Sequence, residues 1–327
     1  MRTGRHIVVT GGAGFIGSHL VDRLLAEGHR VVVVDDLSTG SLHNLAAHRR
    51  EPRLEVITRR VSACRPLPLL AREARLIFHL AAAVGVELVV REPVRTIETN
   101  VHETEALLRA ASPGGAPVLL ASTSEVYGKS RKAAFAETDD LCIGPPHLGR
   151  WAYACSKLMD EFLALAHARQ HHLPVIIARL FNTVGPRQTG RYGMVLPRLV
   201  RAALAGEPLQ VYGTGRQTRC FCHVRDTVEA LWRLAQSPAA YGQVINVGNT
   251  REIRILDLAR LVKKICQSPS PVVRVPYAAA YAPGFEDMQR RRPLIRRLVR
   301  LTGFRPRLPL EQAIQDVKQE LLNRPSA

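Results

Sequence analysis

Tyr153 and Lys157 form the pair of side chains in this sequence best suited to proton transfer. They lie four residues apart in a segment whose apolar residues recur at helical spacing, so both belong to one face of the expected helix. A tyrosine has an ordinary pKa of about 10 and serves as a base near neutral pH only when nearby cations stabilise the phenolate. Lys157 would supply part of that charge. On its own, the same spacing also occurs on ordinary surface helices.

Three glycines near the N-terminus predict a phosphate-binding loop. Gly11 permits a tight turn, Gly14 lets backbone N–H groups approach a pyrophosphate, and Gly17 allows a helix to pack closely on the preceding strand. The N-terminus of that helix favours negative charge. The expected loop comprises Gly11, Gly14, Phe15, Ile16 and Gly17.

Two adjacent aspartates extend this loop into a cofactor site. Asp35 and Asp36 follow the apolar residues 31–34, about 20 positions beyond the glycines, where an acidic residue holds the ribose hydroxyls of NAD. A carboxylate at this point disfavours the additional phosphate of NADP. We therefore predict NAD as the cofactor. The alternative is a glycine turn with two capping aspartates and no ligand.

Strands alternating with helices would position these residues. Short β-branched runs occupy residues 6–10, 31–34, 54–58, 76–80, 118–122 and 175–180, and helical patterns occupy residues 15–27, 93–111 and 150–170. This alternation is typical of a parallel sheet with helices on both faces. The predicted fold class is α/β, a Rossmann-type doubly wound parallel sheet.

The regular alternation of strand and helix patterns ends after residue 182. Isolated helical patterns follow at residues 194–205, 256–266 and 310–322, whereas residues 225–235 and 244–247 are typical of a return to the sheet. We predict a Rossmann domain over residues 1–181, with a return segment at 220–248, and a smaller substrate-binding lobe over 182–327.

The composition is strongly basic. With 46 Lys+Arg against 28 Asp+Glu, the formal charge is +18, which fits nucleic acid, an anionic membrane surface or a small polyanionic ligand. The longest apolar runs are strand-sized, and the apolar stretch that follows the basic N-terminal residues ends at Gly11, so we expect neither a membrane span nor a signal peptide. Six scattered cysteines without a CxxC pair indicate reduced cytoplasmic thiols and no metal site.

Further motifs resemble those of the extended short-chain dehydrogenase/reductase family, which includes nucleotide-sugar epimerases, dehydratases and decarboxylases. The matching segments extend over nearly the whole chain, at residues 78–82, 100–101, 122–128, 179–182, 211–213 and 246–249. The resemblance implies that Tyr153 removes the proton of a sugar 4-hydroxyl while carbon 4 gives a hydride to NAD. It also implies that Thr123 is the hydroxyl partner of the tyrosine.

The same resemblance implies the remaining ligand contacts. The implied cofactor contacts outside the glycine loop and the aspartates are Leu80, Ala81, Ala82, Asn100, Tyr153 and Lys157. The implied contacts to a nucleotide sugar are Asn182, Tyr212, Arg219 and Arg292. A homodimer formed through the helices that carry Asn100 and Tyr153 is a further implication.

Ser124 and Glu125 bear on the reaction that follows oxidation. Family dehydratases carry Thr-Asp-Glu here, so Ser124 argues against dehydration, and Glu125 argues against the small residues of many 4-epimerases. Ser-Glu before Val-Tyr-Gly is similar to the UDP-glucuronate decarboxylases. In those enzymes the two residues lie beside the glucuronate ring, and the arginine matching Arg219 stabilises or protonates the intermediate left by carbon dioxide.

The resemblance therefore implies an NAD-dependent conversion of UDP-glucuronate to UDP-xylose through a 4-keto intermediate, with NAD recycled. A UDP-hexose or UDP-hexuronate 4-epimerase using the same base is the alternative. A non-catalytic protein that binds nucleotides or nucleic acid would fit the charge, but Thr123, Tyr153 and Lys157 together argue against it. A UDP-sugar is thus the expected partner, and no specific nucleic acid is expected.

Overall fold

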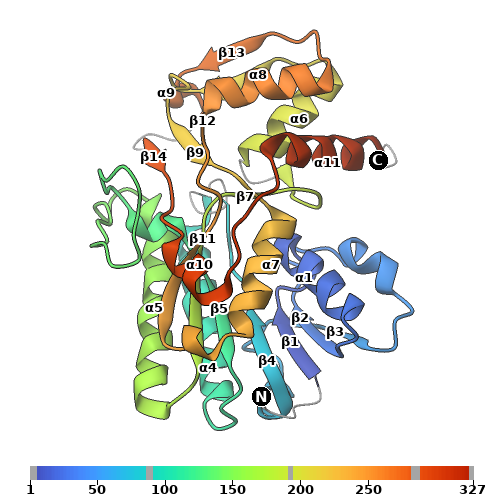
Figure 1. Cartoon of the computed structure of the whole chain (residues 1–327), viewed down its shortest axis with the longest axis vertical. Coiled ribbons are helices and arrows are strands. Elements are labelled where there is room, and N and C mark those ends of the chain that lie inside the picture. Colours follow the sequence, from blue (N-terminus) through green and yellow to red (C-terminus); the bar gives the residue numbers. More distant parts are fainter. Residues whose placement is uncertain (1–5, 86–90, 191–193, 281–287, 324–327) are drawn as a thin grey trace.

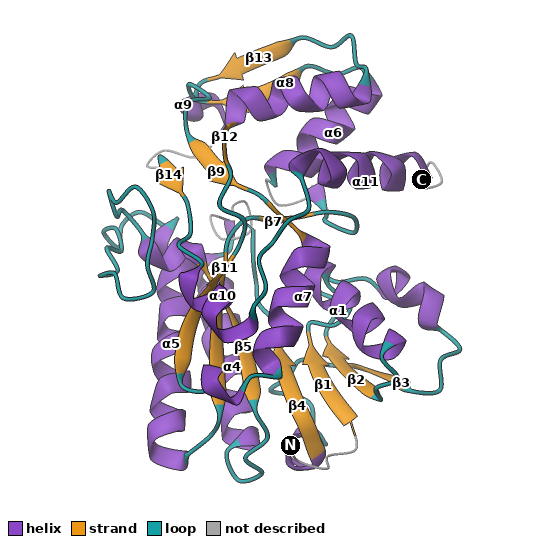
Figure 2. Ribbon diagram, viewed as in Figure 1, coloured by secondary structure: helices purple, strands orange, loops and turns teal. Residues whose placement is uncertain are grey.

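A seven-stranded parallel sheet forms the frame of the protein in the computed structural model, which describes residues 6–85, 91–190, 194–280 and 288–323. The strand order is β11-β6-β5-β4-β1-β2-β3, and every neighbouring pair is parallel (Figures 1 and 2). The strands are β1 (His6–Thr10), β2 (Val31–Asp35), β3 (Leu54–Thr58), β4 (Ala74–His79), β5 (Val118–Thr123), β6 (Val175–Leu180) and β11 (Gln243–Val247). Because β4 lies beside β1, the strand order reverses there and opens a crevice at the carboxyl ends.

Helices cover both faces of the sheet, which confirms the doubly wound fold. Every residue of β1 and β2 is buried, as expected for strands covered on both sides. The helices α1 (Phe15–Ala26), α7 (Val224–Ala235) and α10 (Arg296–Thr302) pack on one face. The opposite face carries α2 (Leu67–Glu73), α4 (Pro93–Ala111) and α5 (Trp151–His171).

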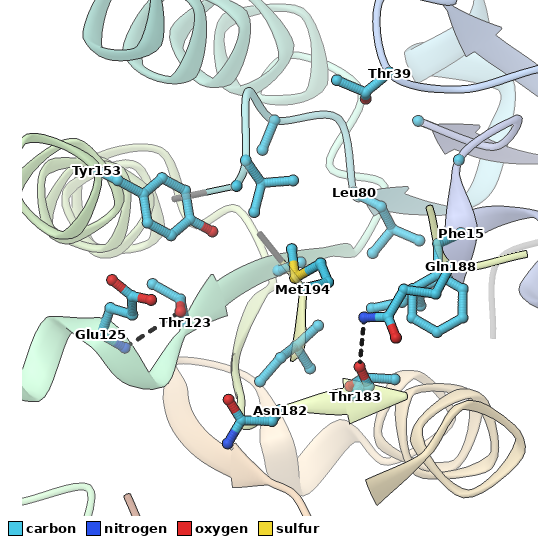
Figure 3. A pocket seen from close by; sticks show the side chains of 18 of the residues that line it. Phe15, Thr39, Leu80, Thr123, Glu125, Tyr153, Asn182, Thr183, Gln188 and Met194 are labelled. Carbon is cyan, nitrogen blue, oxygen red and sulfur yellow. Dashed lines mark hydrogen bonds between the residues drawn. The ribbon is translucent and has the colours of Figure 1, made fainter. Parts of the chain in front are cut away.

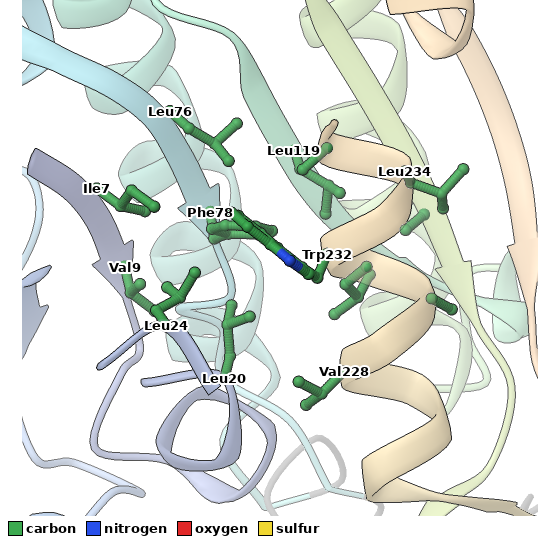
Figure 4. Packing of buried hydrophobic residues seen from close by; sticks show 14 of the residues in the cluster. Ile7, Val9, Leu20, Leu24, Leu76, Phe78, Leu119, Val228, Trp232 and Leu234 are labelled. Carbon is green, nitrogen blue, oxygen red and sulfur yellow. The ribbon is translucent and has the colours of Figure 1, made fainter. Parts of the chain in front are cut away.

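Aromatic packing ties α7 to the N-terminal half of the sheet. Trp232 of α7 lies 6.5 Å from Phe78 of β4 between ring centroids, and both pack with Leu20 and Leu24 of α1 (Figure 4). The strand β11 pairs with β6 in the same sheet. The chain thus returns to the sheet over residues 224–247, as its sequence pattern predicts.

Apart from α10 and the short helix at 238–240, which pack on the sheet, the other elements after residue 182 gather above the carboxyl ends of the strands (Figure 1). The helices α6 (Val195–Ala205), α8 (Ile255–Cys266) and α11 (Leu310–Asn323) share a separate apolar cluster. Small sheets are formed by β7 (Thr183–Val184) with β10 (Cys222–His223), by β8 (Leu209–Tyr212) with β13 (Val272–Val275), and by β12 (Glu252–Arg254) with β9 (Thr218–Cys220) and β14 (Arg290–Arg291). Short helices are η1 (Leu42–His48), η2 (Ser124–Tyr127), η4 (Pro238–Ala240) and α9 (Tyr277–Ala280).

The predicted element boundaries hold within a few residues. The strand expected at 76–80 begins at Ala74 and ends at His79, which leaves Leu80 in the loop beyond the strand. The helix expected from residue 194 begins at Val195, and α2 was not expected. Across the described ranges, no helix combines the length and apolar character needed to cross a membrane. All six cysteines are free thiols.

Candidate active site

A deep pocket lies where the carboxyl ends of β1, β4, β5 and β6 meet the elements above the sheet (Figure 3). Its wall includes the glycine loop, the ends of several parallel strands and residues from α6, β8 and β14. Predicted site residues that line it are Gly11, Gly14, Phe15, Ile16, Gly17, Asp35, Asp36, Leu80, Ala81, Ala82, Thr123, Glu125, Tyr153, Lys157, Asn182, Tyr212 and Arg219. Ser124, Asn100 and Arg292 are not part of the lining.

The glycine loop forms a cradle at the start of α1. Gly11 has a φ of +70°, and a Cβ there would lie 2.7 Å from the backbone nitrogen of Ala81. A Cβ on Gly17 would lie 2.1 Å from the carbonyl oxygen of Gly11. A Cβ on Gly14 would meet only that same oxygen, at 3.1 Å, so Gly14 otherwise faces open space. This space at a helix N-terminus fits a pyrophosphate.

Replacing Gly14 by alanine separates cofactor binding from folding. The backbone at Gly14 is extended, with φ −76°, so Gly14→Ala should fold with little loss of stability. The added methyl group would occupy the cradle, and we expect NAD affinity to fall by at least about tenfold, or about 1.4 kcal/mol. Isothermal titration with NAD measures the change.

Gly149→Ala is the matched control, because a Cβ on Gly149 meets nothing within 4 Å. It should bind NAD as the unmodified protein does. Unchanged NAD affinity in Gly14→Ala would contradict a pyrophosphate at the cradle.

Asp35 and Asp36 lie at the other end of the cradle. The carboxylate of Asp35 accepts backbone N–H bonds from Ala13 at 2.9 Å and Leu37 at 2.8 Å, and burial raises its pKa. Asp36 accepts a bond from the Ser38 nitrogen, and its Oδ2 lies 3.6 Å from Nε of Arg60. A glycine cradle followed by carboxylates fits the diphosphate and ribose of NAD.

Asn100 supports the cofactor side of the pocket from behind. Its side-chain oxygen accepts a bond from the Ala83 nitrogen at 2.7 Å, and its amide donates to Oγ of Ser156 at 3.0 Å. Asn100 therefore ties the loop after β4 to α5. That loop brings Leu80, Ala81 and Ala82 to the pocket wall.

Tyr153 and Thr123 form a hydrogen-bonded pair at the centre of the pocket. Thr123 ends β5, and its hydroxyl accepts a bond from the Glu125 nitrogen at 3.2 Å while pairing with Tyr153 (Figure 3). Burial raises the pKa of Tyr153, and the charge of Glu125 adds to that rise; the Thr123 hydrogen bond and Arg291 oppose it. Tyr153 thus needs further positive charge before it can act as a base.

Lys157 lies one helical turn beyond Tyr153 on α5. Its side chain is buried, and Nζ donates to Oδ2 of Asp160 at 2.7 Å. Lys157 lines the pocket, as Tyr153 does. The helix therefore brings the Tyr153 and Lys157 side chains to one wall of the pocket, as the spacing predicts.

Glu125 is held between two arginines. Its Oε1 lies 2.9 Å from Nη1 of Arg291, and its Oε2 lies 3.8 Å from Nη2 of Arg150. The Arg291 guanidinium also donates to the side-chain oxygen of Asn182. Neither arginine was predicted as a site residue from the sequence. The structure brings both to the residue expected beside the sugar ring.

Strand alternation explains why Arg291, and not Arg292, lines the pocket. Arg290 and Arg292 both reach Glu252, at 2.9 and 3.6 Å, whereas Arg291 reaches Glu125. Successive side chains on a strand point to opposite faces, so a shift of one residue exchanges a pocket residue for an outer one. Arg291 pairs in register with Arg219 of the adjacent strand β9, which brings both arginines to the pocket.

Ser124 lies outside the pocket lining, whereas Tyr212 is part of it. Ser124 is buried at the start of η2 outside the pocket lining, and no described group hydrogen-bonds its hydroxyl. Tyr212 lines the pocket, with the guanidinium of Arg198 4.2 Å from its ring centroid. Within the described part of the chain, no cluster of three or more His, Cys, Asp or Glu residues could hold a metal ion.

Comparison with known proteins identifies the family. The sequence model of the NAD dependent epimerase/dehydratase family matches residues 7–248, most of the chain. The chain belongs to this family. Residues 7–248 include the glycine cradle, the aspartates, Thr123, Glu125 and the Tyr153 helix, whereas β14 with Arg291 lies beyond them.

Individual relatives with named activities match most of the chain. A UDP-N-acetyl-alpha-D-glucosaminuronate decarboxylase of Bacillus cytotoxicus is 38% identical over 318 residues, 96% of this chain and 97% of the relative. UDP-glucuronic acid decarboxylase 1 of Danio rerio is 37% identical over 320 residues, 96% of this chain and 72% of the relative. UDP-glucuronic acid 4-epimerase from Bacillus cereus, solved with UDP-glucuronic acid and NAD, has a TM-score of 0.87 at 26% identity and covers 97% of this chain and 99% of its own.

Several pocket residues of this epimerase/dehydratase family member escaped the sequence analysis. Arg150 immediately precedes α5, and Arg291 lies next to Arg292, the residue that was predicted to contact the nucleotide sugar. Gln188 donates to the Thr183 carbonyl at the pocket wall, with Met194 close by (Figure 3). The closeness of Arg150 to the Tyr153 motif was the available signal for Arg150. No local pattern marks the others.

Proposed function

We propose that the protein is an NAD-dependent decarboxylase that converts UDP-glucuronate to UDP-xylose through a transient 4-keto sugar. The observation that carries the proposal is the contact of Glu125 with Arg291 beside the pair Thr123 and Tyr153. It combines a base suited to oxidation at carbon 4 with a charged cluster for the chemistry at carbons 5 and 6. The names of the Bacillus cytotoxicus and Danio rerio relatives support the same reaction class.

Tyr153 acts as a phenolate that accepts a hydrogen bond from the Thr123 hydroxyl; it takes the proton of the sugar 4-hydroxyl and becomes a neutral phenol. The glycine cradle and Asp35 would hold NAD, which when bound would supply a reversible hydride acceptor for carbon 4, so that the overall reaction involves no net oxidation. The Lys157 ammonium stabilises the phenolate from the same helix face.

The 4-keto group makes the sugar carboxylate a β-keto acid. The bond between carbons 5 and 6 breaks, carbon dioxide leaves, and the electron pair remains as an enolate over carbons 5 and 4. We assign stabilisation of that enolate to the Arg291 guanidinium, because the attraction between a fixed cation and the substrate becomes stronger as negative charge develops. Arg219, its neighbour in register, then serves the diphosphate end with Asn182. Protonation of carbon 5 and re-reduction of carbon 4 complete UDP-xylose.

Glu125 reduces the net positive charge that Arg291 presents to the substrate. A lone arginine would stabilise the substrate carboxylate as strongly as the transition state and so gain no rate. The Glu125 contact at 2.9 Å lowers the positive charge available to the ground state. Arg150 on the other carboxylate oxygen keeps Glu125 in place.

Product analysis tests the proposal. Purified protein with NAD is incubated with UDP-glucuronate, and in parallel with UDP-N-acetylglucosaminuronate, the sugar class named for the Bacillus cytotoxicus relative. UDP-xylose and carbon dioxide support the proposal, and faster decarboxylation of the acetamido sugar would assign that substrate. UDP-galacturonate would instead identify a 4-epimerase, the activity named for the Bacillus cereus structure. Absence of turnover with both sugars contradicts both assignments.

We further propose a homodimer through α4 and α5. Val94 and Ile97 of α4 and Met159 and Phe162 of α5 are exposed apolar residues, with Phe162 at 60% exposure. Such residues on two helices packed together form a surface that a second copy of the chain would cover. Phe162→Asp should convert the dimer to a monomer in analytical ultracentrifugation; an unmodified chain that sediments as a monomer contradicts the proposal.

A cytoplasmic location belongs to the same proposal. Six free thiols without a disulfide suit a reducing compartment. NAD and nucleotide sugars as ligands suit it as well. Fractionation of the source cells, with detection of the protein in the soluble fraction, checks the location.

A further inference from the structure

Asp160 is a buried carboxylate that lies outside the pocket lining. Its Oδ2 lies 2.7 Å from Nζ of Lys157, and the side chains of Asp160 and Lys157 are 0% and 2% exposed. Both residues belong to α5, three positions apart. Lys157 lines the pocket and Asp160 does not, so Asp160 does not contact a ligand in the pocket directly.

Neutral hydrogen-bonding groups support Asp160 from behind. The Thr104 side chain of α4 bonds the Asp160 carboxylate, and Nε2 of His79 lies 3.1 Å from the Thr104 hydroxyl. The other ring nitrogen of His79 lies 2.7 Å from the Thr10 hydroxyl. Burial, followed by the nearby Lys157 charge, lowers the pKa of His79 to about 3, so His79 is neutral near pH 7. The support therefore adds no charge of its own.

The other charged groups around α5 have partners of their own. Glu161 binds Arg179 of β6 at 2.7 Å, and Glu103 of α4 accepts two bonds from Ser62. On the Tyr153 side, Glu125 of η2 pairs with Arg291 of β14. Asp160 is thus the carboxylate that contacts Lys157 directly.

We propose that Asp160 is a positioning residue that anchors Lys157 and partly cancels its charge at Tyr153, and so sets the pH above which Tyr153 acts as a base. The proposal rests on Tyr153 being the base of the proposed function. A cation bound to a buried carboxylate acts at a distance as a dipole, and its field falls off faster than that of a free cation. Tyr153 therefore receives less stabilisation from Lys157 than the spacing alone suggests.

Geometry gives Asp160 a second effect. An ammonium has three donors on a flexible stem of four carbons, and one donor is committed to Asp160. The remaining donors are held in fixed directions before a ligand arrives. Asp160 thereby reduces the rotamer freedom that Lys157 would lose on binding.

Two substitutions at the same position separate charge from packing. Asp160→Asn keeps the shape and removes the negative charge, whereas Asp160→Glu keeps the charge. The readouts are the pH dependence of kcat with UDP-glucuronate and a titration of Tyr153 in the NAD-bound protein. Phenolate absorbance follows that titration, as the difference from the same protein with Tyr153→Phe. Thermal unfolding reports packing separately.

We expect Asp160→Asn to move the acidic limb of the pH profile and the Tyr153 titration about one pH unit lower, a tenfold change in the ionisation equilibrium. Asp160→Glu should leave both near those of the unmodified protein. If Asp160→Asn fails to fold, Asp160→Ala removes the same charge and should give the same downward shift. An unmoved titration, a shift to higher pH, or equal shifts in the Asn and Glu variants would overturn the proposal.

The two readouts distinguish this proposal from the proposed function. The phenolate titration needs bound NAD but no turnover, so it remains informative if the substrate is another sugar. Retained activity in Tyr153→Phe would refute Tyr153 as the base, whatever Asp160 does. Loss of activity in Tyr153→Phe with an unmoved titration in Asp160→Asn would refute the Asp160 proposal alone.

Discussion

Tyr153→Phe should lower turnover of UDP-glucuronate by about 10²–10⁴-fold, the range that a positioned acid or base contributes. The substitution removes one oxygen, the atom that pairs with Thr123 and points into the pocket. The other hydroxyl on that helix face, of Ser156, is bonded to Asn100 and the Tyr153 carbonyl and lies outside the pocket lining, so it does not replace the lost group. Steady-state assays of UDP-xylose formation measure the loss.

The loss of turnover identifies a catalytic role only if the Tyr153→Phe variant still binds NAD. The glycine cradle and Asp35 are untouched, so NAD should bind Tyr153→Phe with its ordinary affinity. Tyr241→Phe is the control, because Tyr241 lies outside the pocket lining. It should turn over like the unmodified protein. Substantial activity in Tyr153→Phe, or loss of activity in both variants, would contradict the assignment of the base.

The pH dependence follows from the same group. Burial raises the pKa of Tyr153, and the acting form is the phenolate, so activity should increase as the pH rises toward that pKa. Lys157 and the positive charge of a bound nicotinamide oppose the burial effect. The acidic limb of kcat therefore reports how well those cations compensate.

Arg291→Gln should lower kcat by about 10²–10³-fold, the cost of removing one preorganised group that stabilises developing negative charge. The guanidinium contacts Glu125 and Asn182, so its loss leaves the enolate without its cation and Glu125 without its 2.9 Å partner. We expect a smaller change in KM than in kcat. Steady-state kinetics with UDP-glucuronate separate the two constants.

Arg292→Gln is the matched control. It removes the same charge one residue along the chain, but Arg292 is 45% exposed and reaches Glu252 at 3.6 Å. Its kcat should stay within about twofold of that of the unmodified protein, as is usual for a surface change. Equal losses in the two variants would point to the general charge of the arginine run. A large loss in Arg292→Gln alone would restore the role that the sequence suggested for it.

Most of the fold could be predicted from local sequence patterns. Apolar, β-branched runs predict the seven strands of the main sheet, because parallel strands covered on both faces are recognisable as continuous apolar runs; the half-exposed edge strand β3 is predicted by its place in the alternation. Gly11, Gly14 and Gly17 were informative because each has a separate steric reason. The helix α2 was missed, since seven residues give too few repeats for a helical period.

The contacts in the site that join distant segments of the chain could not be predicted from local sequence patterns. Glu125 and Arg291 lie 166 positions apart, and no periodicity links them. The choice between Arg291 and Arg292 depends on the register of the short strand β14 against β9. Asp160 was overlooked because a carboxylate on a helix is ordinary until burial against Lys157 is known. Sequence spacing therefore located the proposed base but not the charged groups that surround it.

The most direct measurement is product analysis after conversion of UDP-glucuronate in heavy water. Oxidation at carbon 4, loss of carbon dioxide and return of the same hydride predict UDP-xylose with one deuterium at carbon 5. They predict none at carbon 4, because only carbon 5 takes a proton from solvent. UDP-xylose with deuterium at carbon 4 would contradict return of the hydride. UDP-galacturonate, with carbon 6 retained, would contradict the decarboxylation itself.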